Sequence, residues 1–161
     1  MKKEKILELK VLIINNEKWI NLPCDDKLNN EYKILDFKTE LLIDDFMVFD
    51  SDINQLNDFA LMVKKISDKD FEKLNVILSS GVYAESLSDV MDVIQNLELF
   101  EVINNISNYC ELGEHFGRDK ENIEYEKLGK TIAEDENGIF LDNVYLSCSN
   151  PSYYQGFWGQ I

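Results

Sequence analysis

The first third of the chain contains short apolar runs that are typical of β-strands. Residues 5–14 and 19–22 are rich in Ile, Leu, Val and Trp, and residues 15–17 predict a turn between them. Pro23 ends the second strand, because proline cannot donate a hydrogen bond to a sheet. Residues 31–37 alternate apolar and polar residues, which predicts a third strand. This part of the chain therefore predicts a small antiparallel sheet of three strands.

The middle of the chain repeats its apolar residues at spacings of three and four, which is typical of helices. One helix is predicted over residues 53–66, with Ser51 or Asp52 as its N-cap. A second begins at Ser67 and ends at Gly81, and a third begins at Ser86. Each of these two serines precedes an aspartate by three residues, which is the signature of a capping box.

A fourth helix is predicted from about residue 98 to residue 110. Its apolar residues would lie on one face, at Leu99, Val102, Ile103 and Ile106. Gly113 and Gly117 would end this helix, since glycine often follows the last helical turn.

The last part of the chain has a mixed pattern. Residues 121–132 predict a short helix, and residues 136–138 predict a hairpin turn, because Asn-Gly tolerates positive φ angles. Residues 139–146 would be the return strand. From Asn143 to Ile161 the chain has no charged side chain and is rich in aromatic residues.

These patterns predict an α+β fold of three small subdomains that abut, because no Pro- or Ser-rich linker separates them. Residues 1–50 would form the antiparallel sheet, residues 51–96 the helical part, and residues 97–161 an α+β part with an uncharged aromatic tail. The chain of 161 residues is 45 % apolar, which is enough to bury a core.

The charge narrows the classes of partner. There are 31 acidic and 16 basic residues, a net charge of −15. Direct binding to nucleic acid or to an anionic membrane is not expected, because both need a basic surface. No apolar run approaches the roughly 18 residues of a membrane span, and Glu8 and Lys10 interrupt any signal-peptide segment. A cytoplasmic location is therefore expected.

The acidic residues are spread along the chain. Residues 39–63 contain six acidic residues and no Lys or Arg, and residues 74–117 contain seven and again no Lys or Arg. Such carboxylates can serve solubility alone, and Asp52, Asp89 and Glu101 are also candidates for helix capping. Alternatively they imitate DNA phosphates, which occur about every 1.7 Å along a duplex. The candidate acidic surface consists of Asp36, Glu40, Asp44, Asp45, Asp50, Asp52, Asp58, Glu85, Asp89, Asp92, Glu98, Glu101, Glu111, Glu114, Glu121, Glu124 and Glu126.

Catalytic and metal motifs find little support. Three well-separated cysteines without a C-x-x-C pair disfavour a zinc site or a disulfide framework. His115 is the single histidine, and no nucleophile elbow or phosphate-binding loop accompanies it. The segment that opens at Asp50 like a calcium loop has Gln55 and Leu61 where the EF-hand needs Gly and Glu. No enzyme activity, cofactor or metal is expected, and a hydrolase with a carboxylate pair is the disfavoured alternative.

Several segments, in order along the chain, resemble the ArdA antirestriction proteins. They are Lys18-Trp-Ile-Asn-Leu-Pro23, Asn30-Glu-Tyr-Lys-Ile-Leu-Asp-Phe37, Asp52-Ile-Asn-Gln-Leu-Asn57, Glu98-Leu-Phe-Glu-Val102, Asn122-Ile-Glu-Tyr-Glu-Lys-Leu-Gly-Lys130 and Asn137-Gly-Ile-Phe140. The resemblance covers most of residues 10–146. It departs from the family at Lys130, where arginine is usual, and in the tail after Leu146.

The resemblance implies an elongated, three-part homodimer whose acidic surface mimics bent B-form DNA. Such a protein occupies the DNA groove of type I restriction–modification enzymes, on their modification and specificity core, and protects incoming DNA of a mobile genetic element. The alternative is an acidic interaction module that binds another basic DNA-binding protein.

The aromatic residues near the C-terminus have two interpretations. They can belong to a final strand that packs on its own subdomain. Alternatively they form a dimer contact, because an uncharged surface avoids repulsion between two acidic chains. The candidate dimer contacts are Tyr145, Tyr153, Tyr154, Phe157 and Trp158.

Overall fold

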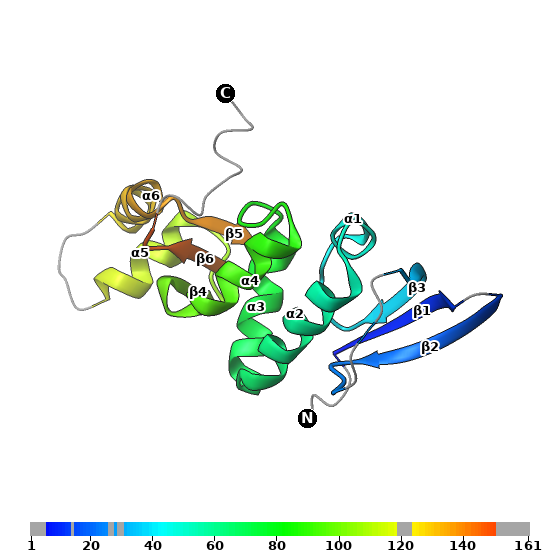
Figure 1. Ribbon diagram of the computed structural model, residues 1–161. Helices are drawn as coiled ribbons and strands as arrows, with labels where there is room; N and C mark the ends of the chain where they lie inside the picture. Colours follow the sequence, from blue (N-terminus) through cyan, green and yellow to red (C-terminus); the bar gives the residue numbers. More distant parts are fainter. Residues whose placement is uncertain (1–5, 14, 26–27, 29–30, 119–123, 151–161) are drawn as a thin grey trace. The chain divides into compact units, whose positions relative to one another are not determined.

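The fold is known from a computed structural model, which describes residues 6–13, 15–25, 28, 31–118 and 124–150. The chain divides into two compact units, an N-terminal unit of Met1–Gln95 and a C-terminal unit of Asn96–Ile161 (Figure 1). Each unit contains helices and an antiparallel sheet, so the predicted α+β class is confirmed. The finer division into three subdomains, with a boundary at residue 50, stays a prediction.

The N-terminal unit begins with a three-stranded antiparallel sheet, as the pattern of apolar residues in this part of the chain predicts. Its strands are β1 (Leu7–Ile13), β2 (Asn16–Leu22) and β3 (Lys33–Thr39), in the order β2-β1-β3. On β1, Leu7, Leu9 and Val11 are buried and the residues between them face outward. One face of the sheet therefore belongs to the core and the other is open to solvent.

Four helices follow the sheet. They are α1 (Asp45–Phe49), α2 (Ile53–Lys65), α3 (Asp68–Ser80) and α4 (Leu87–Gln95). The predicted caps are confirmed, since Asp52 accepts from the Gln55 amide at 2.8 Å and Ser67 accepts from the Asp70 amide at 3.0 Å. Gly81 ends α3 with a φ of 71°. Its lack of a side chain suits this left-handed conformation.

Two asparagines fasten irregular segments to the helices of this unit. Asn57 on α2 accepts from the Cys24 amide at 2.8 Å and donates to the Cys24 carbonyl at 3.1 Å. Asn75 on α3 does the same for the segment before α1, accepting from the Leu42 amide at 3.0 Å and donating to the Glu40 carbonyl at 3.3 Å. These paired bonds satisfy backbone groups that lie outside regular structure.

The C-terminal unit combines two helices with a second three-stranded antiparallel sheet. Its elements are the 3-10 turn η1 (Leu97–Leu99), β4 (Phe100–Asn104), α5 (Tyr109–Gly117), α6 (Tyr125–Glu136), β5 (Ile139–Leu141) and β6 (Val144–Cys148). The strand order is β4-β6-β5. Its core centres on Ile106, Leu112, Ala133 and Tyr145.

The predicted helix over residues 98–110 is wrong. The chain instead forms η1, the strand β4 and a turn at Asn105, whose φ of 64° is incompatible with a helix. The helix of this region begins only at Tyr109, where Asn108 accepts from the Glu111 amide at 2.8 Å. The strand β4 is stabilised by its pairing with β6. The local spacing of apolar residues does not reveal a partner so far along the chain.

Gly113 also differs from the prediction, because it lies inside α5, whereas Gly117 is the last residue of that helix. A Cβ atom at Gly113 would overlap the carbonyl oxygen of Tyr125, and one at Gly129 of α6 would overlap the carbonyl oxygen of Tyr109. The glycines therefore let the two helix backbones approach closely.

The predicted hairpin turn at residues 136–138 is wrong as well. Asn137 has a φ of 51° and closes the C-terminus of α6, where its amide donates back into the helix. The hairpin turn lies further on, at Asp142 and Asn143 between β5 and β6. Asn137 thus adopts the positive φ that the Asn-Gly pair predicts, but this conformation ends a helix and does not form a hairpin turn.

No helix of the described residues is long and apolar enough to cross a membrane.

Candidate acidic interaction surface

The solvent face of the N-terminal sheet carries charges of both signs. By strand register, this face holds Glu8, Glu17 and Asp36 together with Lys10, Lys33 and Lys38. The Lys10 ammonium lies 2.9 Å from the Glu17 carboxylate, and Lys38 lies 4.7 Å from the ring centre of Trp19. Asp36 sits opposite Lys10 in the register. Opposite charges at neighbouring positions cancel at short range, so Asp36 is not part of a continuous acidic surface.

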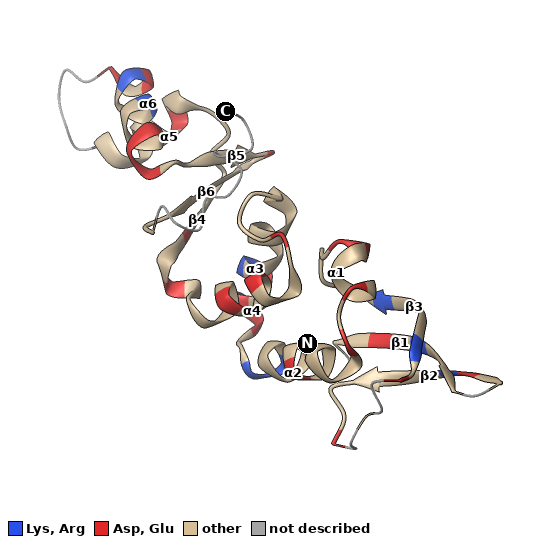
Figure 2. Cartoon of the chain, turned by 45° about the horizontal axis from the view of Figure 1, so that its top comes forward, with Lys and Arg blue, Asp and Glu red and all other residues tan. Residues whose placement is uncertain are grey.

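Acidic side chains without neighbouring lysines in the sequence begin after β3. Glu40, Asp44, Asp45, Asp50, Asp52 and Asp58 are all exposed. Asp44 and Asp50 flank α1, and Asp45 lies in its first turn. Asp52 has a structural function because it caps α2. Figure 2 shows acidic residues and no basic residue along α1 and its two flanking positions.

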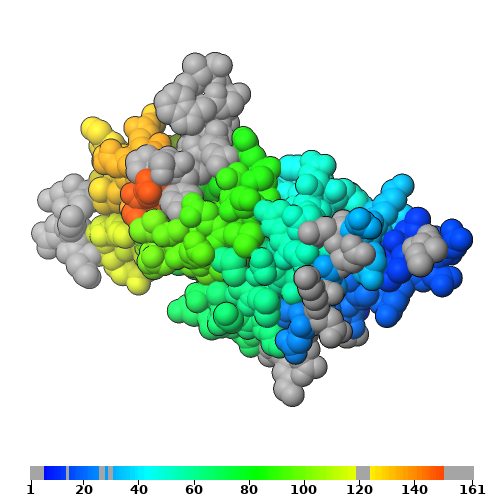
Figure 3. Space-filling view, in the orientation of Figure 1, coloured from blue at the N-terminus to red at the C-terminus, as the bar shows by residue number. Residues whose placement is uncertain are grey.

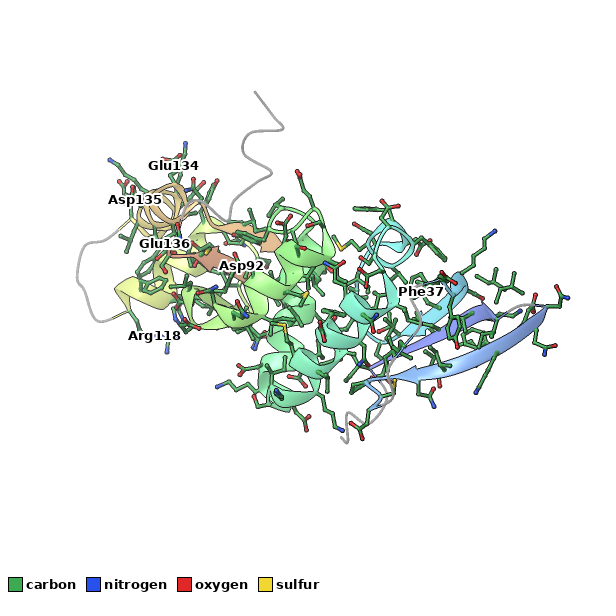
Figure 4. All side chains as sticks on the ribbon, in the orientation of Figure 1. Phe37, Asp92, Arg118, Glu134, Asp135 and Glu136 are labelled. Atoms are coloured by element: carbon green, nitrogen blue, oxygen red, sulfur yellow. The ribbon has the colours of Figure 1, made fainter. Side chains whose placement is uncertain are left out.

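A second acidic group of the N-terminal unit lies at α4. Asp89 accepts from the Glu85 amide at 2.9 Å, and its own amide donates to Ser86 at 3.2 Å. The predicted helix start at Ser86 is confirmed, since Ser86 caps α4, but the Asp89 carboxylate binds the amide one residue before the cap and not that of Ser86 itself. Glu85 and Asp92 are exposed, and Figure 4 shows Asp92 on α4.

The C-terminal unit carries Glu98, Glu101, Glu111, Glu114, Glu124 and Glu126, of which all but Glu111 are exposed. Glu111 accepts from the Ser107 amide at 3.2 Å and from the Asn108 side chain at 3.1 Å, so it stabilises the turn before α5, whose N-cap is Asn108. Glu101 was a candidate for helix capping, and this prediction is wrong. It lies on β4, paired with Ser147. Glu121 lies outside the described residues.

Three further acids, Glu134, Asp135 and Glu136, form the last turn of α6 and were not among the candidates (Figure 4). Glu134 and Asp135 are exposed. Acidic residues at a helix C-terminus oppose the helix dipole, so their position is not explained by helix stability. The run of three carboxylates in the sequence was the available signal.

The charge is denser in the C-terminal unit. Residues 96–161 hold 12 acidic and four basic residues, a net charge of −8 over 66 residues, whereas residues 1–95 have a net charge of −7. Twelve of the 16 basic residues belong to the N-terminal unit. Within the described part of the chain, no three His, Cys, Asp or Glu side chains come together as metal ligands.

The structure corrects one candidate dimer contact. Tyr145 is fully buried in the core of the C-terminal unit, and its hydroxyl donates to Glu136 at 2.6 Å. Its side chain has no surface left for a second chain. Burial, followed by the Glu136 carboxylate, raises the pKa of Tyr145. Tyr153, Tyr154, Phe157 and Trp158 lie outside the described residues.

The three cysteines form no disulfide and differ in exposure. Cys110 on α5 is exposed, Cys24 is half-buried, and Cys148 at the end of β6 is buried. Burial raises the pKa of the Cys148 thiol, which donates to the Asn150 carbonyl at 3.4 Å. A raised pKa keeps a thiol protonated and poorly nucleophilic, so Cys148 is suited to packing and not to chemistry.

Comparison with known protein families and with curated proteins found no match to this chain. The interpretation of the acidic surface therefore depends on its own chemistry and on the resemblance of its segments. Most candidate carboxylates are exposed on helical segments and turns. Asp52 caps α2, while Asp89 and Glu111 accept from backbone amides just before α4 and α5.

Proposed function

We propose that this chain is a DNA mimic, a protein whose carboxylates occupy the DNA-binding groove of a basic partner. More specifically, we propose an antirestriction protein that inhibits type I restriction–modification enzymes by binding their modification and specificity core. The observation that carries the proposal is the segment from Leu74 to Gly117, where seven acidic residues occur without any Lys or Arg. Five of these seven side chains are exposed.

The form of the surface supports this proposal. A solubilising surface mixes charges of both signs, and the solvent face of the N-terminal sheet has that character. Residues 39–63 and 74–117 do not have that character, since neither segment contains Lys or Arg. The resemblance of segments between residues 10 and 146 to the ArdA antirestriction proteins points to the same function and to a homodimer in the cytoplasm, with no catalytic step and no cofactor.

The physical reason for inhibition is electrostatic. A DNA-binding groove is basic and already arranged for phosphates, so fixed carboxylates gain the attraction and the association rate that DNA would gain. An enzyme that bends DNA also expends about 1–6 kcal/mol on a site of tens of base pairs. A protein that folds in a matching shape avoids this deformation cost and can compete with DNA.

The test is a binding titration of the purified protein against a type I modification enzyme core, with a DNA duplex as competitor, at two salt concentrations. We expect the protein and the duplex to exclude each other, and binding to weaken as salt rises. Simultaneous binding of both would contradict DNA mimicry. Absence of binding at low salt would reject this class of target.

If many carboxylates share the binding energy, the loss of any single one is expected to have a small effect. Asp92→Asn alone is expected to change the affinity less than about threefold, because exposed charges act weakly one at a time. Neutralising Glu85, Asp92, Glu98, Glu101 and Glu114 together is expected to abolish inhibition. Loss of inhibition with Asp92→Asn alone would contradict the distributed mechanism.

A second candidate function is an acidic module for another basic DNA-binding protein, such as a repressor or a nucleoid protein. The lysines favour this alternative, since 12 of the 16 basic residues lie in the N-terminal unit and would oppose a long DNA-like surface. The same titration with a basic nucleoid protein in place of the modification enzyme distinguishes the two targets.

A further inference from the structure

The N-terminal unit exposes a group of apolar side chains around the short helix α1. Leu42 is 56 % exposed, Phe46 49 % and Phe49 46 %. Phe46 and Phe49 are three residues apart in the helix, which brings them to one side of α1. Leu42 lies in the irregular segment that leads into α1. We call these three side chains the α1 patch. Single exposed apolar residues need no explanation, but three large ones within eight residues of the chain mark a binding surface.

The α1 patch is held by a firm scaffold. Met47 and Val48 of the same helix are buried, so α1 is anchored in the core by its opposite side. The ring of Phe49 packs edge-on against Phe37 of β3, with ring centres 5.6 Å apart. Figure 4 shows Phe37 between β3 and α1, and Figure 3 shows the surfaces of these two elements in contact.

The segment before α1 is fixed as well, because Asn75 binds the backbone at both Glu40 and Leu42. The α1 patch is therefore preorganised for binding. A surface that is ordered in advance loses little entropy on binding, which favours affinity.

The rim of the patch is acidic. Asp45 precedes Phe49 by four residues and Asp50 follows Phe46 by four, so each aspartate neighbours a ring on the helix surface. Glu40 and Asp44 are also exposed nearby in the sequence. No Lys or Arg occurs from Thr39 to Val63. An apolar centre with a rim of one charge sign selects a partner of the opposite sign.

We infer that the α1 patch is a docking site for a basic protein surface that presents apolar side chains among its lysines and arginines. This inference rests on the proposed function, because the partner is the same class of basic DNA-binding protein. A second copy of the chain fits poorly, since Asp45 and Asp50 beside the two rings would be repelled by the same residues of that copy. Nucleic acid and anionic membranes carry the wrong charge.

The patch gives the protein a contact that a DNA phosphate backbone does not offer. Attraction between exposed charges weakens with salt, whereas burial of Leu42 and Phe46 does not. A mimic that adds such a contact retains part of its affinity at salt concentrations that release DNA from the same groove.

The test uses two synthetic peptides with the same lysines and arginines, one with leucines and the other with serines at the remaining variable positions. The full-length protein is expected to bind the leucine peptide about tenfold more tightly than the serine peptide, because apolar side chains at the interface centre dominate affinity. In Phe46→Ser this preference is expected to disappear. Leu42→Ser serves as a second variant, and thermal melting establishes that both variants fold.

Phe116→Ser is the matched control. Phe116 on α5 of the C-terminal unit is 42 % exposed, close to Phe46, and lies outside the patch. The control is expected to keep the preference for the leucine peptide. Equal binding of the two peptides by the wild type, or equal loss in Phe46→Ser and Phe116→Ser, would overturn the inference.

Two further measurements distinguish this inference from other outcomes. Sedimentation of wild type and Phe46→Ser reports the oligomeric state, and a dimer that dissociates in the variant would identify a second copy as the occupant and overturn the inference. Titration against the type I modification enzyme core tests the proposed function separately. Failure there, with the peptide preference intact, rejects only that target. Tight binding there that Phe46→Ser leaves unchanged rejects only the patch.

Discussion

Tyr145 is the residue whose environment departs most from what the sequence suggests. Its ring is fully buried, lies 5.5 Å from the ring of Phe140, and ends in a 2.6 Å hydrogen bond to Glu136. In the sequence it opens an uncharged aromatic segment, where a surface contact and a core position look alike. Burial is decided by pairing of β6 with β4 and β5, which brings together residues about 40 positions apart.

We predict that Tyr145→Phe destabilises the protein by about 1–3 kcal/mol at pH 8, because it removes a hydrogen bond to a charged group and leaves the Glu136 carboxylate without this donor. Urea denaturation measures the difference. Phe140→Leu is a useful comparison, since it alters the same aromatic contact and keeps the hydrogen bond. A Tyr145→Phe variant as stable as wild type would show that the bond contributes nothing.

The same pair predicts a pH dependence. Burial and the Glu136 carboxylate raise the pKa of Tyr145 above its ordinary value of about 10. The folded protein therefore keeps the proton while the unfolded chain loses it, and stability present below pH 10 is lost as the pH rises further. The stability gap between wild type and Tyr145→Phe is expected to narrow above pH 10. A gap that stays constant up to pH 11 would contradict the raised pKa.

At the scale of elements, the close contact of α5 and α6 depends on glycines. A Cβ atom at Gly113 would meet backbone atoms of Tyr125, whereas one at Gly117 would meet the flexible end of Leu128 at 2.9 Å. Backbone cannot move aside without separating the helices, but a side chain can change its rotamer.

We therefore predict that Gly113→Ala costs about 3 kcal/mol or more, while Gly117→Ala costs clearly less. Gly81→Ala is the control for backbone conformation alone, because no atom lies within 4 Å of its Cβ position while its φ is +71°. It is expected to cost about 1 kcal/mol. Chemical denaturation ranks the three variants, and equal losses at Gly113 and Gly117 would contradict the proposed contact.

Local sequence signals predict correctly those elements that begin at an N-cap residue or end before a proline. Asp52, Ser67 and Ser86 start helices where the sequence places them, and Pro23 follows β2. The prediction fails where pairing is distant, as at β4, whose partner β6 lies about 40 residues away. It also fails where one signal has two uses, as at Asn137, which ends a helix and does not turn a hairpin. The cap formed by Asn108 and Glu111 was the local signal that would have moved the helix start to Tyr109.

For the candidate acidic surface, too, local properties could be predicted and long-range arrangement could not. Exposure of the carboxylates could be predicted, because charged side chains remain in water unless they are paired. Their grouping could not, since the register of the N-terminal sheet decides that Asp36 lies opposite Lys10. Likewise, the exposure of Phe46 and Phe49 depends on α1 burying Met47 and Val48 in their place.

The last turn of α6 links element stability to the acidic surface. Glu134 and Asp135 lie at the end of the helix where a negative charge is unfavourable, and α6 has no basic residue in its last turn. We predict that Glu134→Gln and Asp135→Asn each stabilise the protein by about 0.3–1 kcal/mol at low salt. Glu126→Gln, in the first turn of the same helix, is the matched control and is expected to destabilise it. Thermal melting at low and high salt measures these effects, and stabilisation by Glu126→Gln would contradict the dipole argument.

At the scale of the whole molecule, the question is whether total charge or its placement determines binding. Long-range attraction depends on net charge, and any removal of carboxylates weakens it. Close contact in a groove depends on where the carboxylates lie. The chain offers a direct comparison, because its sheet face carries acids among lysines, whereas residues 74–117 carry acids without any Lys or Arg.

We predict that two triple variants with the same net charge differ in inhibition. Neutralising Asp92, Glu98 and Glu114 is expected to weaken binding to the modification enzyme core at least about tenfold more than neutralising Glu8, Glu17 and Asp36, since the second set faces Lys10, Lys33 and Lys38. Both variants move the charge of the chain from −15 to −12, so their attraction at long range is the same. Equal weakening would mean that total charge suffices, and the helical carboxylates would then be a solubilising surface and not an imitation of DNA.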